Sequence, residues 1–280
     1  MTWTPLGSDP AEHGALADGV PDWMRSSLRS WFAKNFPVYD AMGGRTDYGF
    51  EKMRRFDLAA RRSPLADRLN TNGPERTFDS LEGDVILRII DWMIMDTHVN
   101  KLNEKHEGVD RILRDGGSKW KVGLRDGVPG LETRVPEGVQ DAADAVISTP
   151  GHAGTLLSEA WHAVFGVNPK PETGYRQAVL AVEAAAIPVV IPTDPTATLG
   201  KVFAAMRDQK DWALDIKKQH KDYPSTAVIL GMVQMLWAGQ GRHAGQPNWA
   251  PNTQAEAEAA VMLAVPLVQW FSSEAIARRP

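Results

Sequence analysis

The sequence predicts a mainly α-helical protein: a helical N-terminal part with one β-hairpin, followed by a helical bundle. Apolar residues recur at helical spacing along most of the chain, and the alternation typical of strands is confined to residues 119–135. A length of 280 residues, with 43% hydrophobic and 24% charged residues, suits one large or two ordinary folded domains. We therefore expect a loose segment at 1–20, a first domain over 21–149 and the bundle over 150–280.

The first domain opens with two predicted helical stretches. Asp22 can cap a helix whose apolar stripe runs until Pro37, where proline stops it. A second stretch carries Phe50 and further apolar residues on one face. It is expected to end before the turn signal Asn72-Gly-Pro.

Three further elements complete this domain. The longest helix is predicted from Ser80 to about Leu113, with a break near Gly108. Alternating residues on both sides of Asp126-Gly predict a hairpin over 119–135. A short helix follows Pro136, and the breaker Thr149-Pro-Gly marks the expected domain boundary.

The second domain is predicted to contain five helices. Thr253 and Glu256 form a capping box that should open the last of them, and Pro266 should kink it. The other four are indicated by apolar stripes over 156–165, 175–186, 199–206 and 228–236.

Charge and composition narrow the function classes. The net charge of −4 argues against a protein that coats nucleic acid, although residues 25–76 hold 11 Lys and Arg against 6 Asp and Glu. The chain contains no cysteine, which excludes disulfides, thiolate catalysis and cysteine-bound zinc. No leader or long apolar run is seen, so we expect a cytoplasmic protein without membrane contact. The basic segment is either solvated or a nucleic-acid-binding patch built on Arg54, Arg55, Arg61 and Arg62.

No common nucleotide, hydrolase or zinc-protease motif is present, and we expect no cofactor. Glu159-x-x-His162 has helical metal-ligand spacing but lacks the second copy that carboxylate-bridged bundles need, so no metal is expected. The loop from Gly239 to Gly245 carries Arg242 and His243 between glycines. Such a loop lets a guanidinium and backbone amides approach a phosphate, or it is a solvated interhelix turn.

Several segments, in this order, resemble bacterial abortive-infection C-terminal domains, which belong to the HEPN superfamily of helical bundles. The resemblance covers about residues 151–271. The segments are Ala160-Trp-His-Ala-Val-Phe-Gly-Val-Asn-Pro-Lys-Pro, Tyr175-Arg-Gln-Ala-Val-Leu-Ala-Val-Glu-Ala-Ala, Ala197-Thr-Leu-Gly-Lys and Arg242-His-Ala-Gly.

This resemblance implies a role in antiviral defence, as an abortive-infection, phage-exclusion or toxin-like protein that pairs as a homodimer through its C-terminal half. Many family members are metal-independent ribonucleases with an Arg, four to six residues and then a His. His243 takes the His position, but no histidine here has an Arg at that offset, so Arg242 or Arg176 would have to supply the charge. Glu183 matches a recurrent family acid. The alternative is a non-catalytic module that binds RNA or a phage or host protein and senses or regulates infection.

Overall fold

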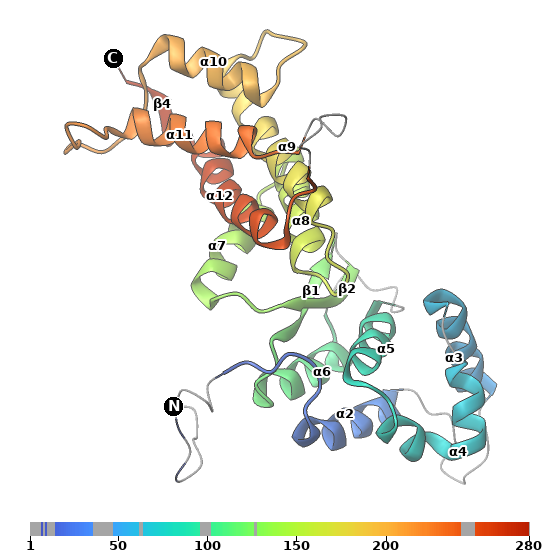
Figure 1. Ribbon diagram of the computed structural model, residues 1–280. Helices are drawn as coiled ribbons and strands as arrows, with labels where there is room; N and C mark the ends of the chain where they lie inside the picture. Colours follow the sequence, from blue (N-terminus) through green and yellow to red (C-terminus); the bar gives the residue numbers. More distant parts are fainter. Residues whose placement is uncertain are drawn as a thin grey trace. The chain divides into compact units, whose positions relative to one another are not determined.

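The computed structural model divides into two compact units, Met1–Arg134 and Val135–Pro280, each of which is described by itself. Helices dominate both units in Figure 1, and the only sheets in the described part of the chain are two antiparallel pairs of strands. The predicted mainly α-helical fold is therefore confirmed. The structure describes residues 7, 9, 15–35, 47–61, 64–95, 102–125, 128–241 and 250–279.

The first unit begins with helix α2, which buries one apolar face as predicted. Asp22, the predicted cap, is instead its first helical residue. Pro37, the expected stop, lies outside the described residues. The helices of this unit are α2 (Asp22–Asn35), α3 (Asp47–Ala60), α4 (Leu65–Asp79), α5 (Gly83–Met95) and α6 (Glu104–Asp115).

The second predicted stretch is two helices, α3 and α4. The carboxylate of Asp57 accepts hydrogen bonds from the backbone N–H groups of Leu65 (2.7 Å) and Ala66 (3.0 Å), so a side chain of α3 caps α4. A break does fall at the predicted turn signal Asn72-Gly-Pro. Gly73 adopts a non-helical conformation with a positive φ of 74° and separates two helical parts of α4, so the helix continues beyond the break.

The longest predicted helix is also two helices, α5 and α6, and its predicted break was misplaced. Gly108 lies inside α6, because the N-terminus of that helix is set earlier by a capping box at Asn103. The Asn103 side chain accepts the N–H of Lys105 (3.1 Å), and Nδ1 of His106 accepts the N–H of Asn103 (3.0 Å).

The predicted hairpin is confirmed as β1 (Trp120–Arg125) paired with β2 (Val128–Thr133), with Trp120 opposite Thr133. Two carboxylates tie it to the helices. Asp91 of α5 accepts the N–H of Leu131 (2.7 Å), and Asp110 of α6 accepts the N–H of Val122 (3.0 Å). The hairpin is thus joined by side-chain hydrogen bonds to α5 and α6 of the first unit. Its expected turn at Asp126-Gly lies outside the described residues.

The second unit contains the five predicted bundle helices, preceded by one more helix and accompanied by a small sheet. The predicted capping box at Thr253 and Glu256 is confirmed, and the last helix runs on through Pro266. The elements are α7 (Glu137–Ile147), α8 (His152–Phe165), α9 (Pro171–Val190), α10 (Leu199–Gln209), β3 (Trp212–Leu214), α11 (Ser225–Ala238), α12 (Gln254–Ser272) and β4 (Ile276–Arg278).

The division between the units falls after Arg134, whereas the sequence placed a domain boundary at Thr149-Pro-Gly. The difference concerns α7. Ala143 and Val146 of this helix are buried in the same apolar core as α8 and α12, so α7 belongs to the second unit. A Pro-Gly signal in the sequence predicts where a helix ends, but it does not predict against which apolar core that helix packs.

Helix α9 forms the centre of the second unit and packs against both α8 and α12, which lie beside it in Figure 1. Buried alanines along these helices let their backbones approach closely, while Trp161 of α8 fills the core with 1% of its surface exposed. Across the described residues, no helix is both long and apolar enough to span a bilayer.

Candidate functional site

The loop between α11 and α12 carries the two main catalytic candidates, Arg242 and His243, which lie outside the described residues. Its two ends are described, and one side chain joins them. Nδ2 of Asn252 donates to the carbonyl of Gly239 (2.9 Å), and its Oδ1 accepts the N–H of Gly241 (3.3 Å). The segment with the candidates therefore leaves and rejoins the fold at one place.

Two residues of helix α9 form hydrogen bonds near the two ends of this loop. A carboxylate oxygen of Glu172 accepts the N–H of Asn252, and the buried Tyr175 hydroxyl donates to the carbonyl of Leu236 (3.2 Å). A Cβ at Gly239 would collide with that hydroxyl, so a glycine is needed where α11 ends. The first two turns of α9 thus position both ends of the loop.

Arg176 follows Tyr175 on the same helix. Its side chain is exposed and makes no hydrogen bond or ion pair with any described residue. A guanidinium keeps its positive charge at every physiological pH. The helix that anchors the loop bearing His243 therefore carries a guanidinium with no ion-pair partner among the described residues.

Glu183 lies two turns further along α9, about 10 Å from Arg176 at 1.5 Å per residue. One of its carboxylate oxygens accepts the N–H of Leu199 (2.6 Å), the first residue of α10. The Thr198 hydroxyl caps the same end by accepting the N–H of Lys201 (3.4 Å). Glu183 is thus a helix cap, placed where a negative charge meets the positive end of the helix dipole.

The described basic candidates of the first unit lie on α3 and directly after it. Arg54 and Arg55 are consecutive on α3, so their side chains leave the helix about 100° apart. Both are exposed, and Arg54 lies 3.8 Å from Glu51. The fourth candidate, Arg62, lies outside the described residues.

Arg61 follows the last residue of α3, has a positive φ of 48° and lines a cavity of about 530 Å³. Arg68 of α4 lines the same cavity and donates to the Ser80 hydroxyl (2.7 Å). Glu82 also lines it, so the cavity is of mixed charge rather than a uniformly basic surface.

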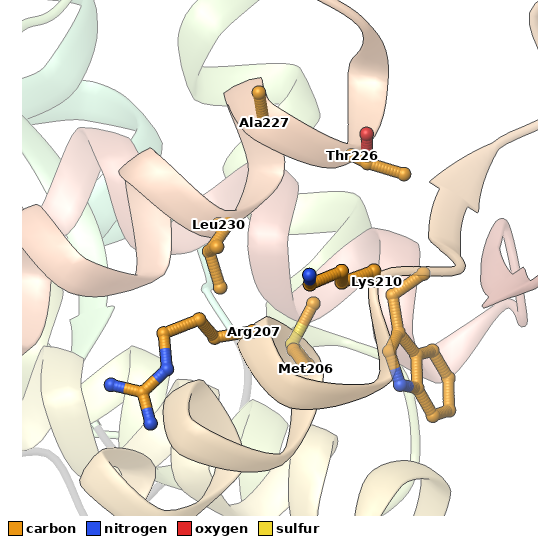
Figure 2. A pocket seen from close by; sticks show the side chains of 7 residues that line it. Met206, Arg207, Lys210, Thr226, Ala227 and Leu230 are labelled. Carbon is orange, nitrogen blue, oxygen red and sulfur yellow. The ribbon is translucent and has the colours of Figure 1, made fainter.

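A second cavity, of about 140 Å³, lies between the end of α10 and the start of α11 (Figure 2). Two cations line it. Arg207 is paired with Asp208 (3.0 Å), whereas the exposed Lys210 has no ion pair in the described part of the chain. The sequence did not reveal this site because its two walls are nearly twenty residues apart. The lining residues are Met206, Arg207, Lys210, Trp212, Thr226, Ala227 and Leu230.

Perturbed pKa values in the described residues mark structural contacts. Hydrogen bonds from Lys201 and Thr196 lower the pKa of Asp194 to about 2, in the loop between α9 and α10. Burial lowers the pKa of His106, which belongs to the α6 capping box. Glu159 accepts a hydrogen bond from Gln177. Among the residues described, no three His, Asp or Glu side chains gather as metal ligands do.

The chain matches no protein-family model, no curated protein and no solved structure. Its function is therefore inferred from the arrangement of its own residues, above all from the contacts of α9 with the two ends of the loop between α11 and α12.

Proposed function

We propose that the second unit is a HEPN-like, abortive-infection module that acts in phage defence or prophage exclusion and cleaves RNA in the cytoplasm without a metal ion. One observation supports this most: Glu172 and Tyr175 of α9 anchor both ends of the loop that carries His243, and Arg176 follows on the same helix. The proposal includes a homodimer that forms through this unit.

The proposed step is transesterification of the RNA backbone. His243 takes the proton of a ribose 2′-hydroxyl, whose oxygen attacks the adjacent phosphorus. The bond from phosphorus to the 5′-oxygen breaks, and that oxygen gains a proton from solvent. The products are a 2′,3′-cyclic phosphate and a 5′-hydroxyl. Arg242 and Arg176 stabilise the negative charge that develops on the phosphate oxygens.

The second candidate is a non-catalytic module that binds RNA or a phage or host protein and senses or regulates infection. Two observations favour it. Glu183, the acid expected at the site, is engaged as the cap of α10. In addition, no Arg stands five to seven residues before His243 in the sequence.

The two candidates are separated by incubating the purified full-length chain with RNA in EDTA. We expect cleavage that falls by at least about 100-fold in His243→Ala, the usual loss for a general base. Arg176→Gln should lower cleavage as well. His152→Ala, which changes an exposed histidine at the start of α8, is the matched control and should cleave normally.

No cleavage by the wild-type chain, or equal cleavage by His243→Ala, would exclude the catalytic role. RNA binding that persists in His243→Ala without any wild-type cleavage would favour the second candidate. Light scattering tests the dimer, and a monomer at micromolar concentration would contradict it.

A further inference from the structure

The segment between β3 and α11, residues 215–224, is rich in lysine and is called the lysine loop here. Lys217, Lys218 and Lys221 are all exposed, and none forms a hydrogen bond or ion pair within the described part of the chain. Of the two acids of the loop, Asp215 lies 4.0 Å from Arg279, which offsets its charge. The loop therefore presents three available ammonium groups.

An exposed aromatic ring stands among these lysines. Tyr223 leaves 70% of its surface exposed, and its ring centroid is 5.6 Å from that of His220. Lysines interleaved with an exposed aromatic are the combination with which proteins bind single-stranded nucleic acid, because the ring stacks on a base while ammonium groups neutralise phosphates.

A cavity of about 200 Å³ opens beside Tyr223, between the lysine loop and the helices α11 and α12. Its wall is largely apolar, and it includes Ile216 and Val228, each about half exposed (50% and 48%). Trp270 of α12 adds an aromatic surface. Apolar and aromatic side chains left open to solvent in this way suit the flat face of a base.

The start of α11 is fixed against the lysine loop. Ser225, the first residue of α11, also lines the cavity, and its backbone N–H donates to Oε1 of Gln219 (2.7 Å), a residue of the lysine loop. This hydrogen bond joins the loop to one wall of the cavity.

We propose that the lysine loop and this cavity bind one unpaired base of single-stranded RNA. The base stacks on Tyr223 beside the apolar wall of the cavity, while Lys217, Lys218 and Lys221 hold the flanking phosphates. The choice of RNA rests on the proposed function, and the site itself rests on the lysines, the exposed ring and the apolar cavity beside it.

The neighbouring cavity extends this surface. It lies on the other side of the first turns of α11, where Figure 2 shows Thr226 and Ala227 of α11 together with Arg207 and Lys210 from the end of α10. Lys210 adds another available ammonium group to those of the lysine loop.

Binding should require an unpaired strand. In an A-form duplex the bases are stacked and paired, so no base face is available to Tyr223, and the major groove is too deep and narrow for side chains to read. A protein that only attracts phosphates would not distinguish the two forms in this way.

The test uses the full-length His243→Ala chain, so that RNA is not cleaved, and a short fluorescent oligouridine whose anisotropy reports binding. Tyr223→Ala should weaken binding about 10-fold, since stacking on one ring contributes about 1–3 kcal/mol per base. Tyr223→Phe keeps the ring and should bind as the parent does. A duplex of the same length should bind more weakly than the single strand.

Changing Lys217, Lys218 and Lys221 together to Gln should reduce the slope of log affinity against log salt by about 2, at roughly 0.7 for each phosphate that is no longer neutralised. The matched control changes Arg88, Arg111 and Arg114 of the first unit to Gln and should leave the slope unchanged. These three substitutions remove the same amount of positive charge from another part of the chain.

No binding by the parent chain, equal binding in Tyr223→Ala, or equal affinity for duplex and single strand would overturn the inference. So would a slope that falls as much in the arginine control as in the lysine variant. Because binding is measured without cleavage, failure of the ribonuclease proposal would appear separately, as intact RNA with wild-type protein that still binds it through Tyr223.

Discussion

Each of the two units has its own apolar core, but the long-range contacts that stand out inside them differ. In the first unit, side chains bind the backbone of distant segments: Nη1 of Arg25 donates to the carbonyl of Leu81 (3.0 Å), and Nε1 of Trp31 donates to that of Lys105 (2.9 Å). The carboxylate of Asp91 completes the pattern by accepting the N–H of Leu131. This framework depends on directional hydrogen bonds.

The second unit depends on close packing between small residues. A Cβ added at Gly174 of α9 would collide with Val164 of α8, so these helices approach each other closely. Alanines are fully or almost fully buried on α8, α9 and α12, among them Ala160, Ala181 and Ala264. The contrast indicates that the first unit responds to the loss of single polar groups and the second to changes of volume.

The largest effect is expected for Trp161→Ala. Emptying the centre of the second unit should cost about 3–5 kcal/mol, as truncation of a buried aromatic does. Hydrogen exchange of the full-length chain should then show reduced protection in α8, α9 and α12, with the first unit unchanged. Met235→Ala, at a 61% exposed position of α11, is the control and should change stability by less than about 0.5 kcal/mol. Reduced protection in both units would contradict the contrast.

Asp91→Ala tests the first unit in the same way. The variant leaves the buried N–H of Leu131 without its acceptor, at a cost of about 1–3 kcal/mol. Hydrogen exchange should accelerate in the hairpin and α5, while α8 and α9 keep their protection. Unchanged exchange in the hairpin would show that the Asp91 hydrogen bond does not stabilise it.

The smallest effect is a pH dependence confined to the first unit. His106 is fully buried, and burial lowers its pKa below the ordinary 6.5, so the unfolded chain takes up a proton more readily than the folded one. The stabilising contribution is complete above pH 6.5 and is lost as pH falls from 6.5 through the lowered pKa of the folded state. Thermal unfolding between about pH 7.5 and 5.5 should therefore show a declining stability.

His106→Gln is the matched variant for this experiment. Glutamine at this position of a capping box can still accept the N–H of Asn103, but it does not titrate. The variant should lose less stability over the same pH range. Equal pH dependence in the two chains would assign the titration to another group.

Sequence patterns predicted elements well where a stripe and its terminal signals agreed. Thr253 with Glu256 opened α12 as a capping box, because caps act within one turn of a helix. The α3–α4 junction was missed because Asp57 caps α4 from the preceding helix. The sheet of β3 and β4 was missed because its strands are three residues long and about sixty residues apart.

Local patterns in the chain were enough to predict the mainly α-helical fold and the five bundle helices, since periodicity and caps are local properties. The packing of the helices was needed to see that α9 anchors the loop after α11, that Glu183 caps α10 and that Trp270 and Tyr223 line one cavity. These relations join residues far apart in the chain. They arise from how helices pack, which no local pattern specifies.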